Sequence, residues 1–178
     1  MESTLASLIA ELPDGTVVTD PDILESYRHD RAVDPNAGTP PVGGGAAAAH
    51  RGGPDRPEVG HRPQDRVVPP RGMGTGLSGG ATALDGGIVL STEKMRDISV
   101  DPPVTRTAVV QPGLLNAEVK KAVAEHGMWY PPDPSSFEIC SIGGNIATNA
   151  GGLCCVKYGV TSDYVLGLQV VLADGTAV

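Results

Sequence analysis

The spacing of apolar residues in the first part of the chain predicts two helices. The first begins at Ser3 or Thr4, whose hydroxyl groups suit a helix cap, and ends at Pro13. Its apolar residues fall on one face: Leu5, Leu8, Ile9 and Leu12. The second helix is short, covers residues 20–27, and is opened by an aspartate-proline pair.

The same spacing predicts a third helix over residues 115–127. Asn116 caps this helix, and Gly127 supplies its stop. Its apolar face consists of Leu115, Val119, Ala122 and Val123.

Short runs of apolar and β-branched residues predict strands between these helices and after them. The strands cover residues 88–90, 107–110 and 165–173, and Asp174-Gly175 predicts a hairpin turn after the last one. Helices and strands that do not alternate regularly indicate an α+β fold.

Two glycine-rich segments, far apart in the sequence, interrupt this pattern. We call Arg71–Gly80 the first glycine segment and Ser141–Gly152 the second. Glycine adopts positive φ at no steric cost, so each segment can turn a row of backbone N–H groups toward one anion. Together they predict a site for a pyrophosphate, although a chain with 24 glycines also contains ordinary turns. Asn145 and Asn149, separated by small residues, favour the ligand site.

The first glycine segment also contains the dinucleotide pattern G-x-G-x-x-G. Glu93 lies near the distance expected of a ribose-binding acid. A Rossmann domain, however, needs a helix that opens at the third glycine, and residues 81–87 have no helical period. The sequence therefore predicts a strand, a glycine loop and a second strand, and it excludes a Rossmann fold.

Five ordered motifs resemble one family of flavoenzymes. They are Pro70–Gly80, Gln111–Gly113, Pro131–Ser136, Ser141–Gly152 and Lys157–Gly159. In order and spacing they resemble the FAD-linked oxidases with a flavin domain of the vanillyl-alcohol-oxidase (PCMH) type, particularly the glycolate oxidase D-subunit and D-lactate dehydrogenase group. The resemblance covers roughly residues 65–178 and implies a PCMH-type FAD-binding domain of two α+β subdomains, incomplete at its C-terminus.

The resemblance implies that the matched residues bind FAD. Residues 72–78 would wrap the pyrophosphate, and Gly113 would pass close to the cofactor. Residues 132–135 and 143–148 would line the side that faces the ribityl chain and the isoalloxazine. Arg71 would add a cationic donor, unless it is an ordinary solvated arginine. The complete predicted cofactor set is Arg71, Gly72, Met73, Gly74, Thr75, Gly76, Leu77, Ser78, Gly113, Pro132, Asp133, Ser135, Ser141, Ile142, Gly143, Gly144, Asn145, Ala147, Thr148, Gly151, Gly152 and Tyr158.

The net charge of the chain requires that a bound pyrophosphate be held by local donors. The formal net charge is −8, so long-range attraction would not retain an anion. A charge-assisted hydrogen bond contributes roughly 1.5 to 3 kcal/mol, so a few backbone N–H groups offset the unfavourable field. The same acidic balance argues against nucleic-acid binding.

Other features limit the location and the chemistry. No apolar run is long enough to span a bilayer, and Glu2 and Glu11 replace the basic start of a signal peptide, which predicts a cytoplasmic protein. Cys140, Cys154 and Cys155 form no C-x-x-C pair, so no metal site is expected.

The cysteines and histidines also bear on how FAD is attached. Some members of the resembled family link flavin covalently to a cysteine near the second glycine segment and to a histidine on the first. Cys140 lies near the second segment, but no histidine occurs between His61 and His126. We therefore predict non-covalent FAD, with linkage to Cys140 as the alternative.

Residues 40–65 break the family pattern. They are rich in Gly, Ala, Pro, Arg and His and contain almost no large apolar residue, whereas the resembled family has a strand and an amphipathic helix here. One hypothesis is a pair of compensating reading-frame shifts, and the alternative is a flexible insertion. Translation of the coding DNA in the other two frames separates them.

These observations predict a first FAD-binding subdomain over residues 1–100 and the start of a second over 101–178, without the family's substrate domain. An intact relative would oxidise a 2-hydroxy acid such as glycolate or D-lactate by hydride transfer to flavin N5, then pass electrons to an acceptor that could be a separate subunit. No catalytic base is assigned here, because His126 at a helix end is expected to complement the helix dipole. The alternatives are a non-catalytic flavin-binding or electron-transfer subunit and an inactive gene remnant.

Overall fold

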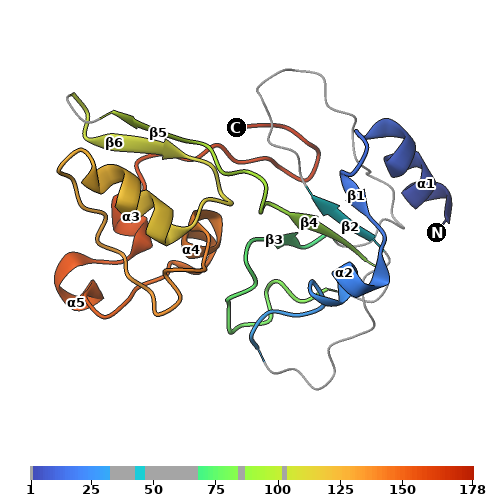
Figure 1. Cartoon of the computed structure of the whole chain (residues 1–178), viewed down its shortest axis with the longest axis horizontal. Coiled ribbons are helices and arrows are strands. Elements are labelled where there is room, and N and C mark those ends of the chain that lie inside the picture. The colour runs from blue at the N-terminus through green and yellow to red at the C-terminus, as the bar shows by residue number, and fades with distance from the viewer. Residues whose placement is uncertain (1, 33–42, 47–67, 84–86, 102–103) are drawn as a thin grey trace.

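The computed structural model describes residues 2–32, 43–46, 68–83, 87–101 and 104–178. They form two units that lie side by side, each with its own sheet (Figure 1). The elements of the first unit are α1 (Glu2–Glu11), β1 (Val17–Val18), α2 (Pro21–Glu25), β2 (Gly43–Ala46), β3 (Pro70–Arg71) and β4 (Ile88–Ser91). The elements of the second unit are β5 (Ile98–Asp101), β6 (Thr107–Val110), α3 (Asn116–Ala124), α4 (Ile142–Thr148), α5 (Cys155–Tyr158) and the 3-10 helix η1 (Thr161–Tyr164).

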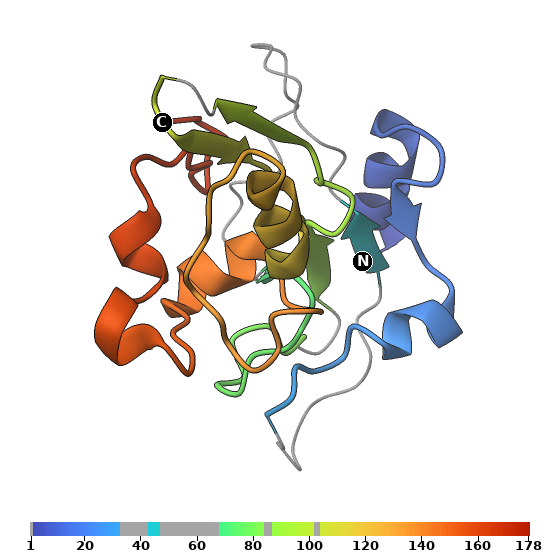
Figure 2. The same cartoon turned by 60° about the vertical axis from the view of Figure 1, so that its left-hand side comes forward.

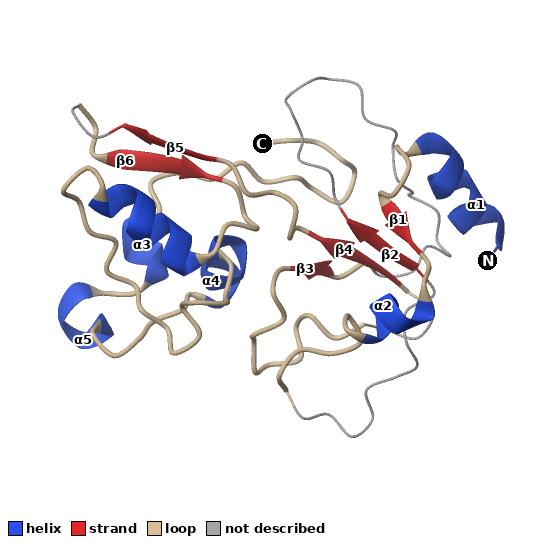
Figure 3. Ribbon diagram, viewed as in Figure 1, coloured by secondary structure: helices blue, strands red, loops and turns tan. Residues whose placement is uncertain are grey.

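The sheet of the first unit has the strand order β1-β2-β4-β3 (Figure 3). β3 and β4 are parallel, with Pro70 opposite Leu90, and the first glycine segment leads from β3 toward β4. No helix follows its third glycine in the described residues 80–83 and 87. The predicted order of strand, glycine loop and strand is confirmed.

β2 lies within residues 40–65, which contain almost no large apolar residue. Gly43–Ala46 pairs antiparallel with β1 and parallel with β4, so neighbouring strands flank it on both sides. A strand in this position is stabilised by backbone hydrogen bonds that require no large side chain. Residues 33–42 and 47–67 lie outside the described part of the chain, so the reading-frame and insertion hypotheses stay untested.

The core of the second unit lies between α3 and the β5–β6 ribbon, which are adjacent in Figures 1 and 2. The buried core residues are Leu114, Val119, Val123 and Ile142. The inward residues of the ribbon, Ile98 and Val100 on β5 and Ala108 and Val110 on β6, pack against them. β6 matches its predicted range, whereas β5 was missed. The predicted boundary at residue 100 falls within β5, and the division into subdomains stays a prediction.

The predicted helices form, but two of their caps are wrong. α1 begins at Glu2, so Ser3 and Thr4 lie inside the helix. α2 has its predicted cap, because the Asp20 side chain accepts from the Asp22 N–H. α3 begins at Asn116, so Leu115 rather than Asn116 takes the N-cap position.

Replacing Glu118 by glutamine should weaken the start of α3. The Glu118 carboxylate accepts from the Leu115 N–H at 2.9 Å, and this backbone hydrogen bond, followed by Arg96, lowers the pKa of Glu118. The group is exposed, so the expected loss is about 0.5 kcal/mol. A lowered pKa means that the stabilisation exists at neutral pH and is lost as pH falls through the folded-state value, which lies below the ordinary 4.5. Urea unfolding of both proteins at about pH 7 and about pH 3 measures this, and an equal difference at the two pH values would contradict it.

The last part of the chain forms its predicted turn without its predicted strand. Gly175 adopts φ 85°, and its N–H donates to the Leu172 oxygen at 2.9 Å, which confirms the Asp174-Gly175 turn. Residues 165–173 contain only an isolated bridge from Val171 to Ala177. The prediction of a continuous strand is wrong, because no neighbouring strand in the described part of the chain pairs with it. None of the described helices is both long and apolar enough to cross a bilayer.

Candidate functional site

The first glycine segment forms an open loop after β3. None of the backbone N–H groups from Gly72 to Ser78 donates a hydrogen bond to another described residue. The loop is held through a carbonyl group instead, because the Gly76 oxygen accepts from the Arg31 N–H at 3.0 Å. Gly74 adopts φ 63°, a left-handed conformation that favours glycine. The free N–H groups supply the donors that a diphosphate requires.

The second glycine segment begins with a helix, so the amides at its start do not form an open row, whereas the N–H groups of Gly151 and Gly152 at its end donate to no described residue. α4 starts after Ser141, whose hydroxyl accepts from the Gly144 N–H at 3.3 Å. The N–H groups of Ile142 and Gly143 each donate to a carbonyl oxygen of residues 112–114 at 2.8 Å. The amides at the start of α4 are therefore already occupied by the protein.

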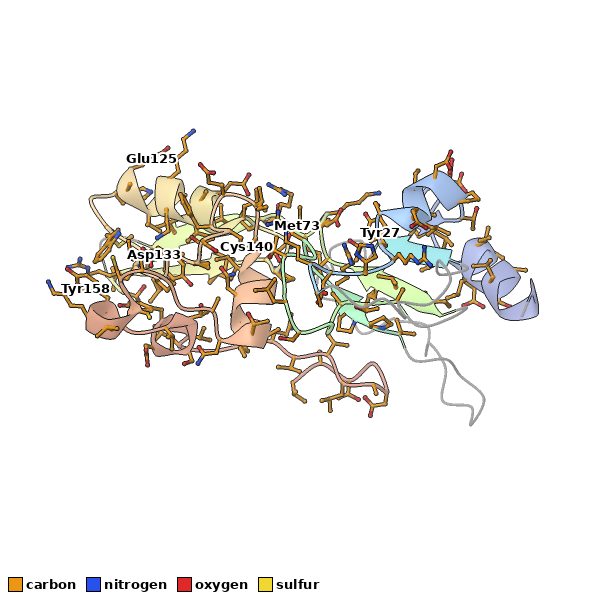
Figure 4. All side chains as sticks on the ribbon, turned by 90° about the horizontal axis from the view of Figure 1, so that it is seen from below. Tyr27, Met73, Glu125, Asp133, Cys140 and Tyr158 are labelled. Carbon is orange, nitrogen blue, oxygen red and sulfur yellow. The ribbon has the colours of Figure 1, made fainter. Side chains whose placement is uncertain are left out.

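The two glycine segments meet at Gly72. A methyl group on Gly72 would collide with the Ser141 hydroxyl and would lie 3.8 Å from the Gly144 nitrogen. In Figure 4, Met73 lies between Cys140, which precedes α4, and Tyr27 of the first unit. The prediction that distant parts of the chain bring these segments together is confirmed, although the amides at the start of the second segment, unlike those of the first, donate within the described part of the chain.

Arg71 is buried beneath the first glycine segment and does not behave as a solvated arginine. Its side chain is 7% exposed, and its guanidinium donates to the backbone oxygens of Ser26, His29 and Ala81 at 3.0–3.3 Å. Burial lowers the pKa of Arg71, and the charges of Glu93 and other neighbours raise it. These contacts point the cation at the protein main chain.

Gly113 packs against the turn that follows β4, and Gly143 packs against Pro112 within the second unit. The Gly113 N–H donates to the Met95 oxygen at 2.8 Å, and a methyl group on Gly113 would collide with the carbonyl oxygens of Thr92 and Met95. A methyl group on Gly143 would lie 2.6 Å from the Pro112 side chain. The structure accounts for both glycines by close packing, and their predicted proximity to the cofactor stays a prediction.

Asp133 and Gly152 connect the motif Pro131–Ser136, which we call the proline-rich stretch, to the end of the second glycine segment. A methyl group on Gly152 would collide with the carboxylate and the main chain of Asp133, and the Cys154 N–H donates to Asp133 Oδ1 at 3.3 Å. On the other side of this stretch, Lys120 donates to the Tyr130 oxygen at 2.7 Å. Burial lowers the pKa of Lys120, and the charge of Asp133 raises it.

The other predicted cofactor residues differ in their exposure. Those open to a ligand from outside are Leu77, Ser78, Ser135, Ala147 and Thr148. Those buried within the second unit are Pro132, Ser141, Ile142 and Asn145. Met73, Thr75, Gly144 and Gly151 are intermediate. The buried group shapes the site from behind, because its side chains already pack or hydrogen-bond within the protein.

Asn116 is a site residue that sequence reasoning assigned to a cap instead. It is fully buried, and its Nδ2 donates to Asn145 Oδ1 at 2.9 Å and to the Pro132 oxygen at 3.3 Å. The Asn145 amide in turn donates to Cys140 Sγ at 3.1 Å. This network ties α3, the proline-rich stretch and α4 together. Asparagine at the first turn of a helix resembles a cap, and nothing in the sequence distinguishes this buried role.

Tyr158 lies away from the first glycine segment. Figure 4 places it at the opposite end of the second unit from Met73, and Figure 1 places α5 far from β3. Its ring packs edge-to-face on Trp129, with centroids 4.8 Å apart, and Lys157 Nζ lies 4.7 Å from the centre of the Tyr158 ring. Tyr158 is therefore not brought together with the loop of free amides.

A strand, a glycine loop whose amides have no partner among the described residues, and a second unit packed against that loop are typical of a nucleotide-binding module. The family model described as "FAD binding domain" matches residues 62–178, and the chain belongs to this family. The cofactor that the family implies is FAD, and the free N–H groups of the first glycine segment fit its diphosphate.

Two named relatives and one solved structure show the extent of the similarity. The chain is 51% identical over 108 residues to the glycolate oxidase subunit GlcD of Bacillus subtilis, and 50% identical over 105 residues to a D-lactate dehydrogenase of Archaeoglobus fulgidus. These matches cover 61% and 59% of this chain but only 23% of each relative. An alkyldihydroxyacetonephosphate synthase structure superposes with a TM-score of 0.81 over 98% of this chain and 35% of that one, at 20% identity, which shows the shared fold.

Proposed function

We propose that this chain is the FAD-binding portion of an oxidoreductase that oxidises a 2-hydroxy acid. The observation that carries the proposal is the loop from Gly72 to Ser78, whose N–H groups donate to no other described residue and which is held against the second unit at Ser141. The relatives named for glycolate and D-lactate direct the substrate class toward small 2-hydroxy acids. When bound, the flavin would accept a hydride from the α-carbon of that acid.

The residues of this chain bind and orient the cofactor in this proposal. Residues 72–78 donate to the diphosphate, and the exposed side of residues 143–148 faces the ribityl chain and the isoalloxazine. Asp133 and Ser135 lie on the same side as the end of the second glycine segment. Asn116 holds α4 and the proline-rich stretch in register, so that both contribute to one surface.

FAD is non-covalent in this proposal. Cys140 is 2% exposed, and its sulfur accepts from the Asn145 amide at 3.1 Å. A thiol engaged within the second unit is poorly placed to form a bond to a flavin carbon. His61, the nearest histidine before the first glycine segment, lies outside the described residues.

The proposal names no residue of this chain as the base that removes the hydroxyl proton, and it includes an electron acceptor and a cellular location. Among the described residues His126 is exposed at the end of α3 and contacts no part of the proposed site, so we assign it no catalytic role. An acceptor subunit is supported by the relative named as a subunit of glycolate oxidase. We propose a cytoplasmic location.

Reconstitution with FAD tests the proposed function. The purified chain should take up FAD, become yellow and retain the cofactor through gel filtration. Bleaching of the flavin absorbance by glycolate or D-lactate without oxygen would support an enzyme, and a yellow protein that never bleaches would support a flavin carrier. Folded protein that stays colourless at high FAD concentration would overturn the proposal.

A further inference from the structure

We propose that Arg71 is a positioning residue, which fixes the first glycine segment against a second stretch of main chain and does not bind the diphosphate itself. That stretch is Ser26–Ala32, which follows α2, and we call it the bracing segment. The inference deepens the proposed function, because it explains how a loop with free amides keeps one shape. It rests on contacts that exist before any ligand binds.

The guanidinium of Arg71 is committed to carbonyl oxygens of the protein. Its Nη1 donates to the oxygens of His29 and Ala81 at 3.0 and 3.3 Å, and its Nη2 donates to the Ser26 oxygen at 3.1 Å. The group also lies 5.3 Å from the centre of the Tyr27 ring. Because Arg71 begins the loop and Ala81 follows it, one side chain ties both ends of the loop to the bracing segment.

The loop rests directly on this guanidinium. A methyl group on Gly74 would collide with the Arg71 side chain. The bracing segment makes two further contacts with this region: the Arg31 N–H donates to the Gly76 oxygen at 3.0 Å, and the Ala83 N–H donates to the Arg28 oxygen at 2.9 Å. The Gly76 carbonyl group is thereby held against the bracing segment, while the N–H groups of residues 72–78 donate to no other described residue.

The charge of Arg71 is balanced within the protein. Asp30 is 5% exposed and its carboxylate lies behind Gly76, while Glu93 accepts from the Tyr27 hydroxyl at 3.0 Å beside the guanidinium. Of the three guanidinium nitrogens of Arg71, only Nε lacks a hydrogen-bond partner in the described part of the chain. A cation between two carboxylates and several carbonyl groups contributes little net attraction to a distant phosphate.

Lysine should not replace Arg71 in this role. A guanidinium offers five N–H donors in a fixed plane, whereas an ammonium group is a compact charge at the end of a flexible stem. Lysine keeps the charge but does not reach carbonyl groups at both ends of the loop together. The substitution Arg71→Lys therefore distinguishes the two roles, because it keeps a charge that could bind phosphate but loses the hydrogen bonds that position the loop.

Hydrogen exchange in the FAD-free chain tests the proposal. In Arg71→Lys, the amides of Arg31 and Ala83 should exchange about tenfold faster than in the wild type, while the Val119 amide in α3 is unchanged. Arg96→Lys, which alters an exposed ion pair with Glu118, is the control and should leave all three amides unchanged. Unchanged exchange at Arg31 and Ala83 in Arg71→Lys would overturn the proposal.

FAD binding gives a second, independent measurement. Arg71→Lys and Arg71→Met should lose FAD affinity to a similar degree, whereas a phosphate-binding charge would be retained by lysine and lost with methionine. If the substituted chains do not fold, the wild type still decides, because its FAD affinity should not fall between about 0.05 and about 0.5 M salt. A steep fall with salt would overturn the proposal.

The two proposals can be tested separately. If the chain binds no FAD, the proposed function is wrong, but hydrogen exchange in the FAD-free chain still tests the role of Arg71.

Discussion

Replacing Gly113 by alanine is expected to lower the free energy of unfolding by about 3 kcal/mol. The added methyl group would collide with the carbonyl oxygens of Thr92 and Met95, which belong to the turn after β4. Both are main-chain atoms, so neither moves aside by changing a rotamer. The Gly113 N–H also donates to the Met95 oxygen, and separation of the two groups would weaken that bond.

Urea unfolding followed by circular dichroism measures this loss. Gly167→Ala is the matched control, because no atom lies within 4 Å of the position where its methyl group would be and its φ is not positive. The control should be neutral or slightly more stable, since alanine restricts the unfolded chain. A Gly113→Ala protein as stable as the control would show that Gly113 does not pack against the Thr92 and Met95 carbonyl groups as described.

Replacing Gly72 by alanine is expected to weaken FAD binding about ten- to hundredfold, equivalent to about 1.4 to 2.8 kcal/mol. The new methyl group would collide with the Ser141 hydroxyl, which caps α4 by accepting from the Gly144 N–H. Relief of this collision requires either that the Ser141 hydroxyl leave its capping position or that the first glycine segment move away from α4. The free N–H groups would then no longer face the surface contributed by the second unit.

A second substitution should restore much of that affinity. In Gly72→Ala with Ser141→Ala, the colliding oxygen is absent, and the methyl group on Gly72 would lie 3.7 Å from the Cβ at position 141, an ordinary contact. Gly80→Ala is the control, because it lies beyond residues 72–78 and meets no atom within 4 Å. Titration of FAD by fluorescence quenching measures all three. Equal affinity of Gly72→Ala and Gly80→Ala would contradict the described contact.

The architecture around the first glycine segment could be predicted from the sequence because local rules dominate there. Glycine spacing, the absence of a helical period over 81–87 and the apolar run at 88–90 together define a strand, a loop and a strand. α3 follows from its apolar face in the same way. These features depend on neighbours in the sequence, so no knowledge of tertiary contacts was needed.

The start of α4 could not be predicted as easily, because its glycine-rich composition is typical of a loop. A helix with two adjacent glycines near its start is costly by intrinsic propensity, and only the Ser141 cap indicates a helix. The carbonyl groups that receive its first N–H groups come from residues 112–114, which are distant in the sequence. Tertiary hydrogen bonds, and not local preference, convert this segment from a loop into a helix.

The position of Arg71 illustrates the same limit. The sequence places an arginine beside a phosphate-binding loop, which suggests a cationic donor. Apart from the Ala81 oxygen, the acceptors of its guanidinium lie in residues 26–29, more than forty positions earlier, and nothing in that stretch marks its carbonyl groups as partners. β2 is a comparable case, since its glycines form a strand only between β1 and β4.

The central claim is that backbone N–H groups of residues 72–78 hold the diphosphate of FAD, whereas those at the start of α4 are already occupied. Hydrogen exchange of the chain with and without FAD tests it most directly. Addition of FAD should slow exchange across residues 72–78 and leave the amides of residues 142–145 almost unchanged. Slowed exchange confined to residues 142–145, with residues 72–78 unaffected by saturating FAD, would contradict the claim.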